Sequence, residues 1–229
     1  KNYRKSSQKI YKTQKAYLLK GEKFKEPEFG VIHGYLNIPQ LKSVCKKMGA
    51  SINEYLVSVF IWSIYTEYMH GMPEKRPVRV AVPVNLRPFS AEFEAKKETY
   101  TFEEVLKIVC ESLRSQINKE HLEDIFSYNV SNEKILIARA VPLVLKKLAI
   151  RSVYTSAALA NTSTITNIGN ISVREEYEPY IEGFHAYLAM SKGQNLKGTI
   201  CSYKDTLVFT FSFILKDTSV QKAFFRKLA

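Results

Sequence analysis

The stretch Asn161-Thr-Ser-Thr-Ile-Thr-Asn-Ile-Gly-Asn-Ile171 is the one around which the rest of the chain is organised. It begins with polar residues, becomes β-branched, and then places an amide and a glycine where a strand should stay apolar. Strand side chains alternate between faces, so Ile165 and Asn167 share one face and Thr166 and Ile168 share the other. Such an interruption occurs where a ligand or a second backbone approaches a sheet, and also where a strand ends in a turn. On this stretch alone both interpretations stay open.

Two other segments flank this stretch and give it a context. Before it comes Arg79-Val-Ala-Val-Pro-Val-Asn-Leu-Arg87, and near the end comes Ile200-Cys-Ser-Tyr-Lys-Asp-Thr-Leu-Val-Phe-Thr-Phe211, followed by a short helical pattern. In this order, and with Glu176-Tyr-Glu-Pro179 after the central stretch, they resemble the C-terminal half of the chloramphenicol-acetyltransferase-like (CAT-like) superfamily. That superfamily includes peptide-synthetase condensation domains, wax-ester synthases and alcohol-acetyltransferase-like proteins, and the resemblance is strongest to the last group. It covers roughly residues 28 to 229.

The resemblance implies an acyltransferase with two lobes and a substrate channel between them. An acyl group, with acetyl as the expected one, would pass from an acyl-CoA or acyl-pantetheine thioester to a small-molecule alcohol or amine. The family's catalytic motif, His-His-x-x-x-Asp-Gly, lies on the N-terminal lobe. None of the four histidines here has a His neighbour or an Asp-Gly four residues later: His33, His70, His121 and His185. The chain therefore resembles the lobe without the catalytic base, and a non-catalytic CAT-like binding or assembly module is the alternative.

Candidate site residues follow from the central stretch and from the resemblance. Asn167 carries an amide that donates and accepts hydrogen bonds, Gly169 would allow close approach, and Thr166 lies beside them. His185 would share a strand face with Tyr187, either lining the channel or lying on an ordinary sheet face. These residues are expected at the substrate channel, and no catalytic residue is expected in this chain.

Arg87 is a second kind of candidate, since its five-donor guanidinium suits two roles. It would anchor carboxylates or loop carbonyls as structural support, or it would help to shape the substrate channel. The segment after it departs from the family, because residues 89–98 are short and polar where relatives continue into another apolar strand. Either that strand is lost, or residues are missing from the given sequence between about Ser90 and Glu94.

Composition narrows the function classes. The 229 residues carry a formal net charge of +12, but residues 1–25 hold nine Lys or Arg against one acidic residue, so most of the excess lies there. Residues 1–27 are therefore interpreted as a basic linker segment and residues 28–229 as the lobe. Because the lobe is nearly balanced in charge, nucleic-acid binding is not expected. A complementary N-terminal lobe of the same protein is the expected protein partner, and the sequence leaves homo-oligomerisation open.

Cysteine usage and hydropathy bear on the compartment. Cys45, Cys110 and Cys201 are far apart and odd in number, which favours buried thiols in a reducing cytoplasm. No apolar run approaches the ~20 residues that span a bilayer. No clustered His/Cys set or Gly-rich phosphate loop is present, so neither a metal nor a bound cofactor is expected.

Periodicity predicts an α/β (α+β) fold, a mixed β-sheet flanked by helices with a C-terminal antiparallel hairpin around Lys204-Asp205. Capping boxes at Ser51/Glu54 and Thr101/Glu104 predict two helices. Helices are also expected over 8–19, 38–48, 131–160 (broken at Pro142) and after Asp217 or Thr218. Further strands are expected over 29–37, 77–87 (with Pro83 at an edge or an end) and 180–190.

Overall fold

We describe a computed structural model of the chain that covers residues 14–84, 87–116, 147, 151, 159–191 and 193–229. The predictions for His121 and for most of 131–160, with its break at Pro142, lie outside these residues. Lys147 and Arg151 are helical.

The centre of the fold is a six-stranded mixed sheet in the order β1-β6-β5-β4-β2-β3. Its strands are β1 (Gly30–Asn37), β2 (Val78–Val84), β3 (Arg87–Phe93), β4 (Ser163–Asn170), β5 (Leu196–Tyr203) and β6 (Thr206–Phe213). β4 runs parallel to β2 and β5, and all other pairs are antiparallel. The hairpin β5–β6 turns at Lys204-Asp205, with Lys204 at φ 52°. The predicted mixed sheet and terminal hairpin are confirmed.

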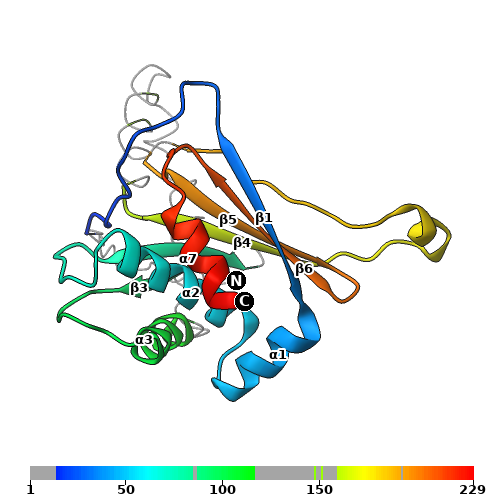
Figure 1. Ribbon diagram of the computed structural model, residues 1–229, viewed down its shortest axis with the longest axis horizontal. Coiled ribbons are helices and arrows are strands. Elements are labelled where there is room, and N and C mark those ends of the chain that lie inside the picture. Colours follow the sequence, from blue (N-terminus) through cyan, green and yellow to red (C-terminus); the bar gives the residue numbers. More distant parts are fainter. Residues whose placement is uncertain (1–13, 85–86, 117–146, 148–150, 152–158, 192) are drawn as a thin grey trace, which may run out of the picture.

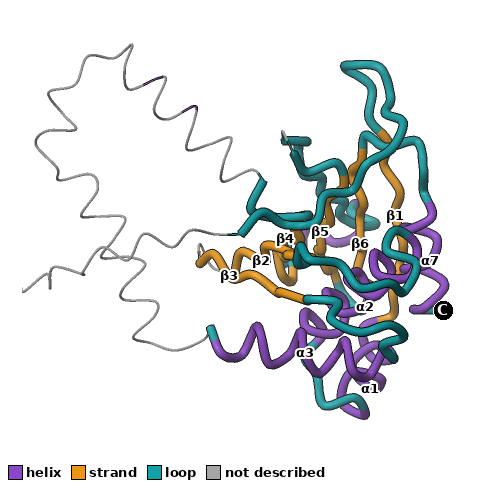
Figure 2. The backbone as a smooth tube through the Cα atoms, turned by 90° about the vertical axis from the view of Figure 1, so that its left-hand side faces the viewer, coloured by secondary structure: helices purple, strands orange, loops and turns teal. Residues whose placement is uncertain are grey.

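Helices cover one face of this sheet, which we call the inner face. They are α1 (Ile38–Lys47), α2 (Ile52–Glu67), α3 (Phe102–Ser115) and α7 (Ser219–Leu228). Figure 1 shows α2, α3 and α7 in front of the sheet, and Figure 2 shows the same helices gathered on one side of it. Both predicted capping boxes are formed, each with the reciprocal hydrogen bonds between the cap and the third helical residue. At α7 the Asp217 carboxylate accepts a hydrogen bond from the Ser219 N–H at 2.9 Å.

The core lies between α2, α7 and the inner face. On β6 the alternating residues Phe209 and Phe211 are fully buried and contact Phe224 of α7, with ring centroids 4.4 and 5.0 Å away. Phe60 of α2 closes the cluster at 5.7 Å from Phe211. α2 is buried around most of its circumference because it lies between the sheet and two other helices. The alternating phenylalanines of β6 therefore form the sheet side of the core.

The three cysteines are free and buried in this fold. Burial raises the pKa of the Cys45 thiol to about 11, and it also raises the pKa of Cys110 and of Cys201. Thiols with raised pKa values are weak nucleophiles, so the prediction of inert packing thiols agrees with the structure.

For each of two features near β2, one of the two predicted alternatives is wrong. The strand after Arg87 is not lost: β3 pairs with β2 in an antiparallel hairpin, and Phe89, Ala91 and Phe93 are buried on alternate positions. The polar residues between them hid this pattern. Pro83 lies at a strand end, opposite Pro88, but not at an edge, because β2 is flanked by β4 and β3.

The helix predicted over 8–19 is also wrong where the structure describes it. Residues 14–19 are not helical. Their backbone bonds to distant segments instead, with Ala16 N–H donating to Leu159 O and Tyr17 N–H to Pro77 O. Leu19 enters the core, so these tertiary contacts override the weak helical period.

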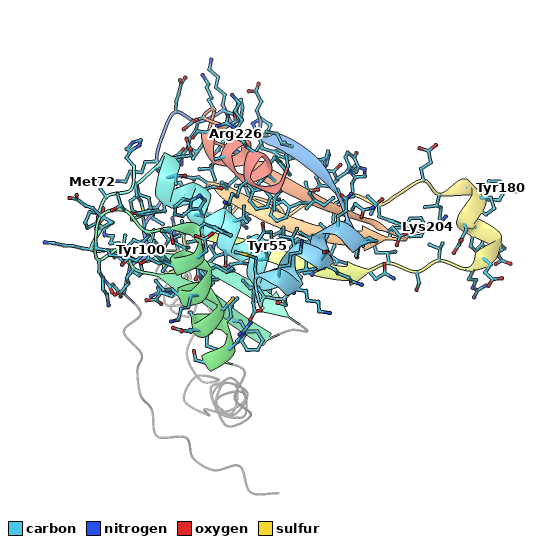
Figure 3. All side chains as sticks on the ribbon, turned by 60° about the horizontal axis from the view of Figure 1, so that its bottom comes forward. Tyr55, Met72, Tyr100, Tyr180, Lys204 and Arg226 are labelled. Atoms are coloured by element: carbon cyan, nitrogen blue, oxygen red, sulfur yellow. The ribbon has the colours of Figure 1, made fainter. Side chains whose placement is uncertain are left out.

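The strand predicted over 180–190 is wrong as well. After β4 the chain leaves the sheet as an arm (residues 171–181) that contains the 3₁₀ helix η1 (Glu175–Tyr180) and returns as an extended strap (residues 182–190). Figure 3 shows Tyr180 at the tip of the arm, far from the core.

Among the described residues the strap makes no backbone ladder. It lies over the outer face of β5, where Lys197 Nζ donates to Ala189 O at 2.8 Å and Cys201 Sγ to Phe184 O at 3.2 Å. The alternating pattern reflects one side of the strap resting on the sheet.

Candidate functional site

Asn167 lies inside β4, one residue from the point where the β4–β5 ladder becomes irregular. Its Nδ2 donates to Asn53 Oδ1 at 2.7 Å, and its Oδ1 accepts from the Gly169 N–H at 2.7 Å. All three residues line a cavity of about 530 Å³ between the start of α2, the end of β4 and the β5–β6 turn. The central stretch is therefore a strand that becomes irregular near its end and borders a cavity there. The sequence had left open whether Asn167 and Gly169 mark such a strand end or the approach of a ligand, and the geometry is compatible with both.

Gly169 is needed for its backbone conformation. Its φ is +88°, a region that residues with a Cβ rarely adopt. A Cβ built at this position would have no heavy atom within 4 Å, so the surrounding space is open. The local bulge is held by the Ile171 N–H, which donates to Ser202 O at 2.7 Å, and by the Ser202 hydroxyl, which donates to Gly169 O at 3.2 Å.

Asn53 is the residue of this site that sequence reasoning missed. It is the second residue of α2, two positions after the Ser51 cap, and the only signal for it was its place at the start of a well-capped helix. Its Oδ1 accepts from Asn167, and among the described residues its Nδ2 has no hydrogen-bond partner. The site therefore offers one oriented amide donor to the cavity.

An ion pair fixes the start of α2. Arg114 of α3 donates from Nε and Nη2 to the two carboxylate oxygens of Glu54, at 2.7 and 3.0 Å. Burial alone would raise the pKa of Glu54, but hydrogen bonds from Arg114 and from Ser51 outweigh it and lower the pKa overall. A charged Glu54 is thus maintained, and it positions the helix turn that carries Asn53.

Charged side chains of both signs surround the cavity. Lys42 of α1 and Lys204 of the β5–β6 turn both line it, with Asp205 as the acidic residue of the lining. The nearest acid to Lys204 outside the cavity is Glu178 of η1, at 3.8 Å. The amino end of α2 adds a partial positive charge at the same place. The Asn53 amide and the two lysines therefore give the site donors for a ligand that carries hydrogen-bond acceptors.

The other two predicted channel residues lie elsewhere. Thr166 is paired in register with Thr199, so its side chain lies on the outer face and away from Asn167. His185 lies in the strap, where its Nδ1 is 3.3 Å from His33 Nδ1, and its Nε2 is 3.4 Å from the Tyr35 hydroxyl. The structure thus brings Asn167 and Gly169 together and separates them from Thr166 and His185.

His33 and His185 form a small polar aromatic cluster on β1. His33 Nδ1 is 3.0 Å from Thr210 Oγ1, and its Nε2 is 3.5 Å from the Tyr187 hydroxyl. Burial, and then the nearby His185, lower the pKa of His33. Among the described residues no carboxylate bonds to either ring, so the pair lacks the orienting acid that a general base normally has.

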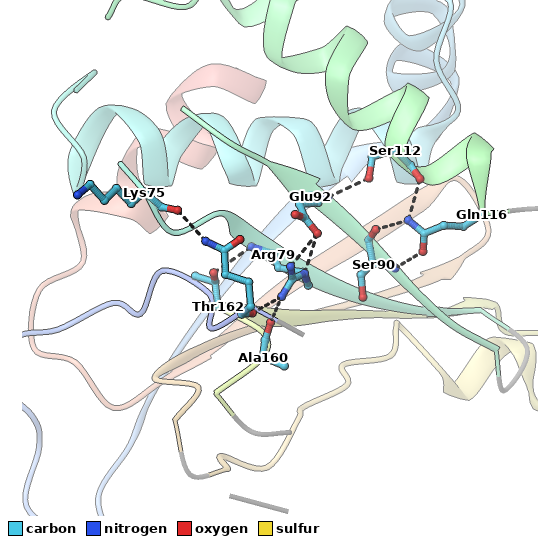
Figure 4. A network of polar contacts seen from close by, with 9 residues as sticks. Lys75, Arg79, Ser90, Glu92, Ser112, Gln116, Ala160 and Thr162 are labelled. Carbon is cyan, nitrogen blue, oxygen red and sulfur yellow. Dashed lines mark hydrogen bonds and ion pairs between the residues drawn. The ribbon is translucent and has the colours of Figure 1, made fainter. Parts of the chain in front are cut away.

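Arg87 begins β3 opposite Val84, and its side chain lies outside the described residues, so its supporting role stays a prediction. A different arginine provides visible support (Figure 4). Arg79 is 8% exposed and donates to Glu92 Oε2 at 2.9 Å, to Gln14 O at 2.9 Å and to Ala160 O at 2.7 Å. It ties β3, the leading segment and the approach to β4 together.

Comparison with known proteins identifies the fold. No family model and no curated protein sequence matches the chain. Among solved structures it is similar to a wax ester synthase/diacylglycerol acyltransferase from Marinobacter aquaeolei VT8, with a TM-score of 0.52 and 14% identity over 87% of this chain and 47% of that one. It is also similar to the epimerization domain from the third module of tyrocidine synthetase B, with a TM-score of 0.55 and 9% identity over 94% and 50%. It is similar as well to the nonribosomal peptide synthetase FmoA3 (S1046A), with a TM-score of 0.56 and 16% identity over 94% of this chain and 22% of that one.

The chain thus has the fold of the C-terminal half of a condensation-like acyltransferase, as the resemblance predicted. It spans about half the length of the first two of these proteins. No helix in the described part of the chain is both long and apolar enough for a membrane span. Nor do the described residues gather three or more His, Cys, Asp or Glu side chains in a way that could hold a metal ion.

Proposed function

We propose that this chain is the C-terminal lobe of an acyltransferase that moves an acyl group from a CoA or pantetheine thioester to an alcohol or amine. A histidine on an N-terminal lobe of the same protein would act as general base toward the acceptor. The present chain would supply one wall of the substrate channel. The observation that carries the proposal is the Asn53–Asn167–Gly169 network, which ends at a 530 Å³ cavity in a fold shared with a wax ester synthase/diacylglycerol acyltransferase.

The chemistry of the cavity supports a thioester donor. Asn167 uses both of its polar atoms within the protein, so it orients Asn53 and leaves the Asn53 N–H free to donate to a carbonyl or amide oxygen. Lys42 and Lys204 would attract the phosphates of a pantetheine-bearing donor. In this proposal the protein acts in the cytoplasm, and a homo-oligomer and nucleic acid are not needed for the reaction.

The test uses the full-length protein with acetyl-CoA and short alcohols, and it measures release of the free thiol. The native protein is expected to release thiol in an alcohol-dependent way, and Asn167→Ala to lower kcat/KM about tenfold through the lost orientation of Asn53. Asn170→Ala is the matched control, because Asn170 also lines the cavity but does not bond to Asn53. Thiol release that equals the background without alcohol would overturn the proposal.

A non-catalytic CAT-like binding or assembly module is the second candidate, and the absence of His-His-x-x-x-Asp-Gly from this sequence favours it. It predicts that the full-length protein binds a CoA thioester without turnover. Binding that depends on Lys42 and Lys204, together with no thiol release, would support this candidate over the first.

A further inference from the structure

A second, larger cavity lies at the opposite end of the sheet, where β1 begins and β6 ends. Its volume is about 860 Å³, and it lies between residues 23–29, which lead into β1, and residues 187–191, 193 and 195 on the way from the strap into β5. Figure 1 shows both connections at the end of β1 that is far from α1. The cavity shares no lining residue with the Asn167 site.

Both walls are anchored, so the cavity is a built feature of the fold. On one side the Phe24 N–H donates to Ile214 O at 2.9 Å, and the Phe24 ring packs on Phe213 at 6.2 Å. On the other side the Lys197 ammonium donates to Ala189 O at 2.8 Å. Burial lowers the pKa of Lys197, and among the described residues this carbonyl is its one hydrogen-bond partner. The buried Lys197 ammonium therefore holds the part of the strap that carries Ala189 against β5.

Apolar side chains make up the larger part of the lining. Six apolar side chains contribute: Phe24, Pro27, Phe29, Leu188, Met190 and Ile214. The polar groups nearest the floor are used within the protein, since Asn195 Nδ2 donates to Leu19 O at 2.7 Å. The charged residues of the lining, Lys23, Glu26 and Glu28, are exposed at the rim. A cavity of this size and lining can hold an apolar ligand, while the charged residues lie at its opening.

We propose that this cavity binds the linear aliphatic chain of a substrate, either the acyl chain of the donor or the alkyl chain of an alcohol acceptor. The inference rests on the proposed function and goes beyond it, because an acetyl group or a short alcohol would leave 860 Å³ mostly empty. Tyr187 also lines the cavity, and its hydroxyl contacts His33 Nε2 at 3.5 Å, which anchors this part of the strap to β1.

Binding to the full-length protein is measured by titration calorimetry with n-alcohols from butanol to decanol and with the fatty acids of equal length. Affinity is expected to rise about fourfold with each added methylene until the cavity is filled. The alcohol arm and the fatty-acid arm distinguish an acceptor chain from a donor chain. An affinity that does not depend on chain length in either arm would overturn the proposal.

Two variants locate the ligand. Leu188→Trp fills the cavity and should weaken decanol or decanoate binding at least tenfold. Phe29→Asp places a charge on a wall residue that is 56% exposed, so it leaves the core intact and should also weaken binding. The matched control is Met72→Trp, at a side chain 52% exposed in the turn after α2, and it should bind as the native protein does. Unchanged binding in Phe29→Asp would overturn the proposal even if Leu188→Trp failed to fold.

These binding measurements do not require turnover. Chain-length-dependent binding without thiol release would support the aliphatic-chain site and overturn the proposed acyltransferase activity. Thiol release with acetyl-CoA, without chain-length-dependent binding, would support the activity and overturn the aliphatic-chain site.

Discussion

The two faces of the sheet are built on different principles. The inner face, under α2 and α7, consists of apolar side chains such as Phe209, Phe211 and Ile165, all at most 1% exposed. The outer face of the same strands is polar, with Thr199, Thr210, Ser212 and Lys197 at most 8% exposed. The inner face is stabilised by burial of apolar surface, whereas on the outer face Thr210 and Lys197 each make an individual hydrogen bond.

The outer face is also incompletely satisfied. Three buried hydroxyls have no hydrogen-bond partner among the described residues, and all three belong to outer-face positions of β5 and β6: Thr199 Oγ1, Tyr203 OH and Ser212 Oγ. The strap that crosses this face presents Phe184 and Ala186 on its less exposed side. The strap is held on this face by the contact between the Phe184 and Tyr203 rings and by the hydrogen bonds from Lys197 and Cys201.

The largest effect is expected on the inner face. Phe209→Ala removes a fully buried ring that contacts Phe211, Phe224 and Phe225, and it leaves a cavity in the core. We expect the free energy of unfolding to fall by about 3–5 kcal/mol. Urea unfolding followed by circular dichroism measures it.

Tyr180→Ala is the control for this measurement, because Tyr180 is 85% exposed at the tip of the arm. It should change the free energy of unfolding by less than about 0.5 kcal/mol. A loss of under 1 kcal/mol in Phe209→Ala would mean that the two faces do not differ in the way described.

On the outer face the largest effect is expected at Arg79. Arg79→Met keeps the length of the side chain but leaves the carbonyls of Gln14 and Ala160 without their charged donor and Glu92 without its ion-pair partner. We expect the free energy of unfolding to fall by about 2–3 kcal/mol, the value of hydrogen bonds to a charged group.

Arg174→Met is the matched control, since the Arg174 side chain is 83% exposed and its contact to Glu176 is 3.7 Å long. Equal effects at the two arginines would show that the Figure 4 network contributes little to stability.

The same contrast explains what the sequence could predict. The inner face repeats apolar residues at the periods of strands and helices, and both capping boxes fix where helices begin, so β6, α2 and α3 could be located from pattern alone. The strap has the alternation of a strand, but its backbone makes no ladder among the described residues, and pattern cannot show hydrogen bonding between chain segments. β3 does alternate, with Phe89, Ala91 and Phe93 buried, but the run is short and its middle apolar residue is a small alanine, so the signal was weak.

The candidate site was half predictable. Asn167 and Gly169 interrupt an apolar strand, which marks them in the sequence, and they lie together on the cavity. Asn53 is 114 residues away and looks like an ordinary residue of a helix start, so only the fold reveals its bond to Asn167. His185 was assigned by a strand period that does not apply to the strap, and it lies beside His33 instead.

The smallest effect is expected at Thr199, and it is the sharpest test of the outer face. Thr199→Val replaces an unpartnered buried hydroxyl with a methyl group of similar size, so the cost of burying that hydroxyl disappears. We expect the free energy of unfolding to stay unchanged or to rise by up to about 1 kcal/mol.

Thr210→Val, at the paired position on β6, loses the contact between Thr210 Oγ1 and His33 Nδ1. It should lower the free energy of unfolding by about 0.5–1.5 kcal/mol. Opposite signs at two paired threonines would show that each hydroxyl on this face matters through its own partner; a clear loss in Thr199→Val would mean that its hydroxyl is bonded, for example to a buried water.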